Sequence, residues 1–300
     1  MAGLIPVSDT IDTVPSPPPA RRQQGWLATL LAHKNLLIGS CLTGGLLLTA
    51  LTSLLYTPHD PLAISIADRL QGPSIVHWFG TDQFGRDVLS RVMLGAVVSM
   101  SVGVVSVGIG LVAGVMLGML SGHFGRAMDE VLMRFMDALY GFPAILLALL
   151  ITAVFGPGIF LSMVAIGIVN IPVFARLTRA NFLMLRERDF VTAARALGAS
   201  DAKLIWHHIL PNAMSPLLVQ STISFPNAIL AEAGLSYLGL GMQPPHPSWG
   251  YMLKEAQPFL RLAPTYAIFP GAAIALAVLG CNLLGDGLRD LLDPKVARQR

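Results

Sequence analysis

The chain has 300 residues, of which 54% are hydrophobic and only 12% are charged. Soluble domains carry about a quarter charged residues, so this composition excludes an ordinary water-soluble domain and predicts an all-α integral membrane protein. The net charge of +3 is scattered over connecting segments without forming a basic patch, which excludes a nucleic-acid-binding surface.

The first 34 residues predict a tail rather than a membrane segment. Asp9 and Asp12 precede a proline-rich run at 15–19. Because this stretch has no basic start and no apolar centre, it lacks the pattern of a signal peptide, and its composition is typical of disorder. We expect a largely disordered cytoplasmic tail over residues 1–34 and a second cytoplasmic tail over residues 291–300.

Five intervals of the sequence lack charged residues and are long enough to supply membrane-spanning helices, each of which needs about 20 apolar residues. The interval 138–175 is too long for one span, and Gly156-Pro157-Gly158 interrupts it, so two spans joined by a tight turn fit there. The six expected spans are Leu36–Tyr56, Val92–Ser121, about 135–155, about 159–180, 204–231 with its helix starting after Pro211, and 262–285. The first span and an extracytoplasmic segment then occupy residues 35–91, and the other five spans form a core over residues 92–290.

The distribution of lysine and arginine predicts the orientation of these spans. With the N-terminus inside, the inner segments hold 15 of these residues and the outer segments hold 5. Cytoplasmic loops of membrane proteins carry an excess of lysine and arginine. We therefore expect both termini, and the polar loop 181–211, in the cytoplasm.

Glycine and proline mark two of the spans. The second span carries Gly110, Gly114, Gly118 and Gly122 at four-residue spacing, so they share one helix face and predict a close contact with another helix. The fifth span contains prolines, which bend helices by packing alone or beside a transport pathway. The residues that we consider for a pathway are Pro216, Pro226, Asn227 and Glu232. Glu232 lies near a span end, where an acid is usually a solvated interface residue and less often a functional one.

The sequence lacks the motifs of several common catalytic and metal sites. There is no G-x-x-x-x-G-K-[ST] phosphate loop, so we expect no ATP binding on this chain alone. Adjacent His207 and His208 make a poor metal site, because neighbouring helical residues point about 100° apart. The outer histidines His59, His77 and His246 have no second ligand at regular spacing, so we expect no metal site. Cys41 and Cys281 lie in apolar stretches and are expected to be buried free thiols.

Several motifs together resemble a known family of membrane proteins. They are Gly80-Thr-Asp-Gln-Phe-Gly-Arg-Asp-Val-Leu-Ser-Arg91, Ala228-Ile-Leu-Ala-Glu-Ala-Gly-Leu-Ser-Tyr-Leu-Gly-Leu-Gly-Met-Gln-Pro-Pro245, Trp249-Gly-Tyr-Met-Leu253 and Gly285-Asp-Gly-Leu-Arg-Asp-Leu-Leu-Asp-Pro294. In these segments the chain is similar to the second permease subunit of dipeptide and oligopeptide importers of the ATP-binding-cassette (ABC) class. The resemblance runs from about residue 30 to the end.

The loop 181–211 resembles the coupling loop through which such permeases contact their ATPase. The residues implied for docking are Thr192, Ala193, Ala194, Gly198, Ala199, Asp201, Leu210 and Pro211. Thr192 replaces the glutamate of the family pattern, so no salt bridge from this position is expected. Small alanines allow close seating of a partner, and glycine allows a sharp turn between two short helices.

The resemblance implies a type I ABC importer fold with six transmembrane helices and a cytoplasmic coupling helix, in a bacterial inner membrane. It implies a homologous second permease, two ATPases that hold ATP and Mg²⁺, and an extracytoplasmic solute-binding protein. This chain would have no cofactor and no catalytic activity. The solute could instead be glutathione, nickel or a nickel chelate. A stand-alone carrier or a membrane scaffold is the alternative of another class, but none of the six expected spans has a charged residue near its centre.

Overall fold

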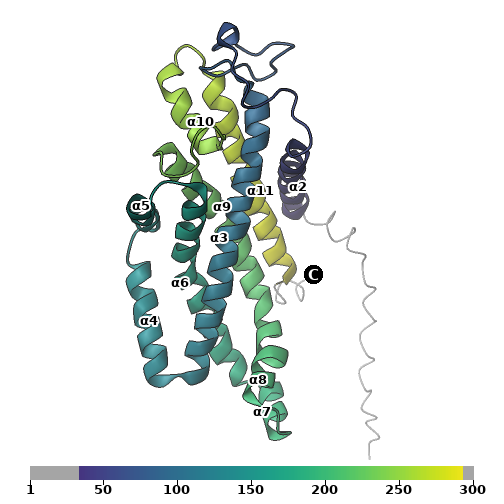
Figure 1. Ribbon diagram of the computed structural model, residues 1–300. Coiled ribbons are helices and arrows are strands. Elements are labelled where there is room, and N and C mark those ends of the chain that lie inside the picture. Colours follow the sequence, from purple (N-terminus) through teal and green to yellow (C-terminus); the bar gives the residue numbers. More distant parts are fainter. Residues whose placement is uncertain (1–33, 293–300) are drawn as a thin grey trace, which may run out of the picture.

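The computed structural model of the chain describes residues 34–292, and this part is helical without any β-strand (Figure 1). The expected tails at residues 1–34 and 291–300 fall almost entirely outside the described residues. The helices are α2 (Lys34–Ser53), α3 (Val88–Phe124), α4 (Arg126–Tyr140), α5 (Ala144–Phe155), α6 (Ile159–Arg186), α7 (Asp189–Ala196), α8 (Asp201–Lys203), α9 (Leu210–Tyr237), α10 (Trp249–Ala256) and α11 (Thr265–Leu292). Short 3₁₀ turns lie at Ile66–Asp68 and Gln257–Phe259. The predicted all-α class is confirmed.

Four helices of the described part, α2, α3, α6 and α11, are long and apolar enough to cross a membrane. They match the expected first, second, fourth and sixth spans. Helix α9 has 28 residues and is therefore about 42 Å long, which is also sufficient, but it carries more polar side chains. Cys281 on α11 is buried as expected, whereas Cys41 on α2 is exposed, so the prediction of two buried thiols is wrong for Cys41.

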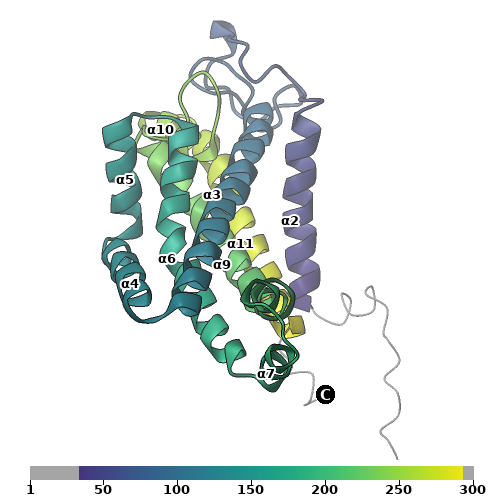
Figure 2. The ribbon, with the colours of Figure 1, turned by 60° about the horizontal axis from the view of Figure 1, so that its bottom comes forward.

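The expected third span, at about 135–155, is not one straight helix. Helices α4 and α5 meet at an angle of 88° across a short break that ends in Pro143. Helix α4 is strongly amphipathic, and α5, with 12 residues, is only about 18 Å long, against a hydrocarbon core of about 30 Å. Helix α4 ends at the cap residue Gly141 and α5 begins after Pro143, which has no backbone donor to continue the helix, and the chain turns between them (Figure 2).

Helix α3 packs lengthwise against α6 through the glycine stripe. A methyl group at Gly114 would lie 2.5 Å from Cβ of Phe174 and 2.8 Å from the carbonyl oxygen of Ile171. At Gly118 it would lie 2.5 Å from the carbonyl oxygen of Ala175. The two other glycines of the stripe, Gly110 and Gly122, face Asn170 and Phe182 in the same way. The two backbones approach this closely because no Cβ separates them.

The fifth expected span begins earlier than predicted. Ser200 accepts a hydrogen bond from the backbone N–H of Lys203 and caps α8, which continues through a π-helical turn at Leu204–Ile209 directly into α9. Pro211 therefore does not restart a helix. It lies inside a helical run from Asp201 to Tyr237, where proline removes one backbone hydrogen-bond donor from the run.

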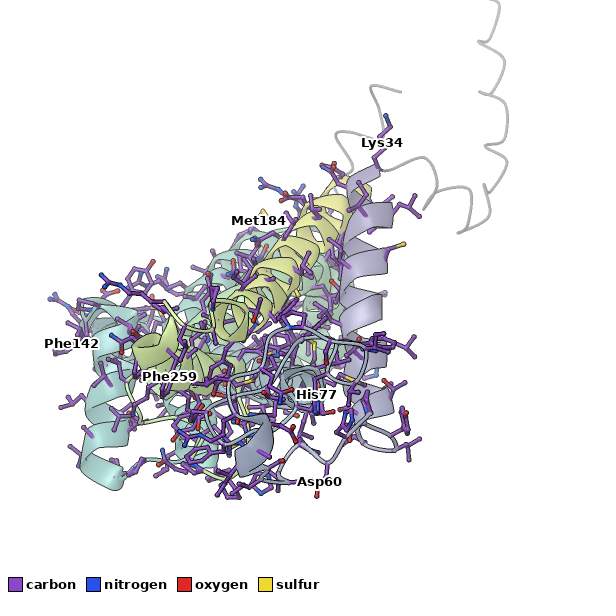
Figure 3. The ribbon with its side chains drawn as sticks, turned by 90° about the horizontal axis from the view of Figure 1, so that it is seen from above. Lys34, Asp60, His77, Phe142, Met184 and Phe259 are labelled. Atoms are coloured by element: carbon purple, nitrogen blue, oxygen red, sulfur yellow. The ribbon has the colours of Figure 1, made fainter. Side chains whose placement is uncertain are left out.

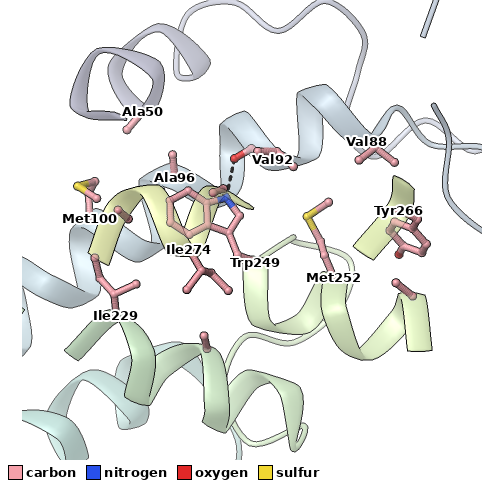
Figure 4. Close-up of a cluster of buried hydrophobic side chains, with 14 of the residues drawn as sticks. Ala50, Val88, Val92, Ala96, Met100, Ile229, Trp249, Met252, Tyr266 and Ile274 are labelled. Carbon is pink, nitrogen blue, oxygen red and sulfur yellow. Dashed lines mark hydrogen bonds between the residues drawn. The ribbon is translucent and has the colours of Figure 1, made fainter. Parts of the chain in front are cut away.

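One end of the bundle is closed by a cap, which we define as residues 54–87 together with α10. Trp249 of α10 is the largest fully buried side chain, and its indole Nε1 donates to the carbonyl oxygen of Val92 at 2.9 Å (Figure 4). Met252, Tyr266 and Ile274 belong to the same buried cluster. Helices α7 and α8 lie at the opposite end (Figure 1).

Candidate functional site

The short helix α7 is held at the end of the bundle by one buried side chain. Val191 is fully buried and packs in a cluster with Phe182, Leu204 and Ile209 from the neighbouring segments. Thr192 and Ala193, on the following positions, are exposed. One face of α7 is therefore fixed to the protein while another remains open to contact by a partner.

A glycine-dependent turn ends α7. Gly198 has φ of +82°, a conformation that L side chains rarely adopt, and no atom lies within 4 Å of the place where its Cβ would stand. Its N–H donates to the carbonyl oxygen of Arg195 at 3.0 Å, and the N–H of Ala199 donates to that of Ala194 at 3.1 Å. This pair of bonds is the Schellman motif, which closes a helix with glycine in the left-handed region. The turn therefore needs glycine for its backbone and not for space.

The other expected docking residues lie around this turn on different elements. Asp201 is exposed at the start of α8, 4.0 Å from the guanidinium of Arg195. Ala194 and Ala199 are partly buried against the cluster beneath α7, as is Leu210, whereas Pro211 is exposed. The loop thus groups Thr192, Ala193, Gly198 and Asp201 at the surface, and Leu210 supports them from below.

Two exposed apolar side chains beside α7 were missed by the sequence analysis. Leu197 is 89% exposed and Phe190 is 42% exposed, at the two ends of the short helix. Phe190 is the second residue of a polar helix and Leu197 directly follows that helix. This placement of large apolar residues is the sequence signal that could have identified them. Large apolar residues at the tip of a polar segment are typical of a contact surface for another protein.

The residues considered for a pathway are not brought together. Asn227 lines a cavity of about 600 Å³ between α4, α5, α6 and α9, across from Asn170 and Tyr140. Pro216 lines a separate, smaller groove beside Gln220 and Arg289. Pro226 and Glu232 line neither of these two hollows and are buried.

Glu232 differs from the expectation of a solvated interface residue. Its side chain is fully buried, and Oε1 accepts a hydrogen bond from the Ser236 hydroxyl at 2.5 Å. Within residues 34–292, its Oε2 has no hydrogen-bond partner. Helix α10 folds back over this part of α9, which places Gly250 against the backbone of Ala233 and excludes solvent. No local sequence pattern predicts this contact between α10 and α9, so the burial of Glu232 was not expected.

The cap is joined to the bundle by a buried cluster of charges, which we call the outer charge cluster: Asp82, Arg86, Arg91 and Glu255. Arg86 Nε lies 2.6 Å from Asp82 Oδ2, and its Nη2 lies 3.0 Å from Glu255 Oε1. Arg91 Nη2 reaches the other oxygen of Glu255 at 2.8 Å, and its Nε lies 3.4 Å from Asp82. Burial lowers the pKa of Arg86, but the neighbouring carboxylates outweigh it and hold the pKa above its ordinary value.

The cap also brings together two of the three outer histidines. His77 Nδ1 lies 3.0 Å from Asp87 Oδ1, and His59 Nδ1 lies 3.7 Å from the same oxygen. His246 lies in the exposed loop before α10 and is not part of this group. The outer histidines have no second ligand at regular spacing in the sequence, but in the structure Asp87 converges with His59 and His77 in space.

Comparison with known proteins places the chain in one family. Residues 114–298 match the family described as binding-protein-dependent transport system inner membrane component. The dipeptide transport system permease protein DppC of Alkalihalophilus pseudofirmus is 44% identical over 267 residues, which cover 89% of this chain and 88% of that protein. Glutathione transport system permease proteins GsiD are similarly related. That of Pectobacterium atrosepticum is 45% identical over 80% of each chain, and that of Escherichia coli O6:K15:H31 is 46% identical over 84% of this chain and 83% of its own.

The fold also matches a solved transporter. An inward-facing form of the MetNI methionine ABC transporter superposes with a TM-score of 0.56 at 17% identity, covering 68% of this chain and 96% of the matched one. At that identity the likeness concerns the fold alone. The family match covers more than half of the chain, and the relatives align with most of it. The chain therefore belongs to the family of binding-protein-dependent transport system inner membrane components.

Proposed function

We propose that the chain is one permease subunit of an ATP-driven importer for small peptides, and that α7 receives the motion of a cytoplasmic ATPase. The observation that carries the coupling role is the tip of α7, where the exposed Leu197 precedes a rigid glycine-closed turn. The named activities of its relatives, dipeptide and glutathione transport, support the peptide class of solute. Glutathione is the second candidate, since the glutathione permeases match at 45–46% identity.

The chain acts with partners in this proposal. It forms half of the translocation path beside a homologous second permease, two ATPases hold ATP and Mg²⁺, and an extracytoplasmic binding protein delivers the solute to the cap. The absence of a phosphate loop from the sequence supports a non-catalytic role for this subunit. The cavity beside Asn227 has walls from α4, α5, α6 and α9 of this chain, which is consistent with half of a path completed by another subunit.

Replacing Leu197 with aspartate is expected to uncouple transport. Burying a leucine contributes about 1.5–3 kcal/mol, so its loss weakens ATPase docking about 10- to 100-fold. The tagged chain is purified with its partners, reconstituted into vesicles and assayed for ATP-dependent uptake of a labelled dipeptide and of glutathione. Uptake of either should fall at least tenfold in the variant, while the amount of inserted permease stays normal.

The control for ATPase recovery alone is Ile75→Asp, which alters a side chain that is 95% exposed on the cap, away from α7. It should retain ATPase in stoichiometric amounts. Normal uptake and ATPase recovery in Leu197→Asp would remove α7 from the coupling role. Peptide uptake by the chain without any ATPase would overturn the importer assignment itself.

Cysteine labelling tests the orientation, with the cap outside and α7 inside. Single cysteines at Ser74 and Ser200, both exposed, are introduced in a background where Cys41 and Cys281 are alanine. An impermeant thiol reagent added to intact cells should label the Ser74 position and leave the Ser200 position unlabelled until the cells are opened. The opposite pattern would invert the topology. Ser248 is unsuitable as a reporter because it is fully buried.

A further inference from the structure

We infer that His59, His77 and Asp87 form a binding site on the cap for a divalent transition-metal ion of the zinc class. Figure 3 looks onto the cap and shows His77 within it and Asp60, the neighbour of His59, at its edge. One ligand atom from each of the three side chains lies within 4.8 Å of the other two. The chain segment that follows α2 and the first residues of α3 meet at this point.

The separations suit a tetrahedral ion. Zinc–nitrogen and zinc–oxygen bonds of about 2.0–2.2 Å place neighbouring ligand atoms about 3.3 Å apart. The Nδ1 atoms of His77 and His59 lie 3.0 and 3.7 Å from Asp87 Oδ1. Both distances are within about half an ångström of that value. The ligand atoms of the two histidines lie within 4.8 Å of each other, so binding requires the imidazole rings to rotate toward a shared ion.

The carboxylate is already oriented for this role. Asp87 caps α3 with Oδ2, which accepts hydrogen bonds from the backbone N–H of Ser90 at 2.8 Å and from its hydroxyl at 2.7 Å. Oδ1 is left facing the two histidines. The Ser90 hydroxyl accepts a hydrogen bond from the backbone N–H of His59 at 3.1 Å. One serine thus positions two of the three ligands, as outer-shell groups of metal sites do.

The hydrogen bond between His77 and Asp87 does not explain why His59 approaches the same carboxylate. The contact between His77 and Asp87 satisfies those two side chains, but it leaves Nδ1 of His59 shielded from solvent and, within residues 34–292, without a hydrogen-bond partner. The two imidazole rings are tilted by 39° with centroids 4.7 Å apart, so they do not stack flat. A second imidazole directed at the same carboxylate oxygen is explained by a shared cation.

The donor set and the exposure identify the class of ion. Two imidazole nitrogens and one carboxylate suit zinc, nickel or cobalt, whereas magnesium and calcium prefer oxygen ligands alone. The side chain of Asp87 is 2% exposed, that of His77 13% and that of His59 38%. The His59 ring therefore forms the solvent-facing side of the site, while its Nδ1 is shielded and lies 3.7 Å from Asp87 Oδ1, so an ion would enter by displacing this ring. A bound ion would clamp the end of α2 to the start of α3.

Zinc binding to the purified full-length permease, together with the subunits that accompany it, tests the site. The protein is stripped with a chelator and titrated with Zn²⁺ alone, and affinity is measured by competition with a chromophoric chelator. His59→Phe keeps an aromatic ring beside His77 but removes one ligand. The variant should bind one zinc equivalent fewer per permease, because the affinity of the site falls more than about 100-fold. Removing an outer-shell group of a metal site typically lowers affinity only about 10- to 100-fold. Ser90→Ala should fall within that smaller range.

The matched control is His246→Phe, which removes an outer histidine that lies apart from the cluster and should leave zinc binding unchanged. Zinc should also raise the thermal midpoint of the wild-type protein but not of His59→Phe. If His59→Phe does not fold, Asp87→Asn provides the test, since asparagine still caps α3 but removes the anionic ligand. Zinc binding equal to wild type in the foldable ligand variant, or no retained zinc in the wild type, would overturn the inference.

Discussion

Replacing Glu255 with glutamine is expected to lower the free energy of unfolding by about 3–5 kcal/mol, the usual cost of removing one partner from a buried ion pair. Glutamine keeps the shape of the side chain, so the loss comes from charge. Arg86 and Arg91 each hold one carboxylate oxygen of Glu255, at 3.0 and 2.8 Å, and the Tyr266 hydroxyl donates to the second at 3.1 Å. Without that carboxylate, two buried guanidinium groups share Asp82 alone.

Thermal unfolding of the detergent-solubilised protein, followed by the recovery of monodisperse material, measures this loss. Glu130→Gln is the matched control, since Glu130 is 70% exposed and pairs with Arg134, which is 79% exposed. Exposed pairs contribute about 0–1 kcal/mol, so the control should melt close to wild type. Equal melting of the two variants would mean that the outer charge cluster does not hold the cap in place.

A single methyl group at Gly114 is expected to destabilise the protein by about 1–3 kcal/mol, while the same change at Gly108 on the same helix is expected to be neutral or stabilising. At Gly114 the new carbon would meet Phe174 and the backbone of Ile171, which have no room to move away. At Gly108 no atom lies within 4 Å. There, alanine contributes its higher helix propensity, about 0.5–1 kcal/mol.

The comparison requires only Gly114→Ala and Gly108→Ala, measured by the same thermal unfolding assay. Opposite signs of the two shifts would confirm that the glycine stripe is required by the contact with α6. Similar shifts in both variants would show that α3 and α6 separate easily in the native protein, contrary to the close packing described above.

Structural features that are set by residues close together along the chain could be predicted from the sequence. The four-residue spacing of Gly110 to Gly122 indicated one packing face, although it did not reveal that α6 is the partner. The turn at Gly198 was visible because glycine, alanine and the flanking polar residues lie next to each other. The break before Pro143 was not predicted, because the apolar content of residues 144–155 obscured the amphipathic pattern of α4 before it.

Features that depend on distant residues could not be predicted. Glu255 lies 164 positions from Arg91, and no pattern in either segment indicates that they meet. The burial of Glu232 depends on α10 folding back over α9. Asp87 was not recognised as a shared partner of His59 and His77 for the same reason, since it is the residue that caps α3.

The unbroken helical run from Asp201 to Tyr237 has a mechanical consequence. It is about 55 Å long, begins next to the turn that closes α7 and ends beneath α10. A continuous helix of this length links the two ends of the molecule mechanically, but its stiffness is not uniform. It is most compliant at three places: the π-helical turn at 204–209 with Pro211 directly after it, Pro216 and Pro226, where prolines remove backbone hydrogen bonds. Torque applied at α7 would therefore be released as bending at those three places, and the stiff stretches between them would swing as units.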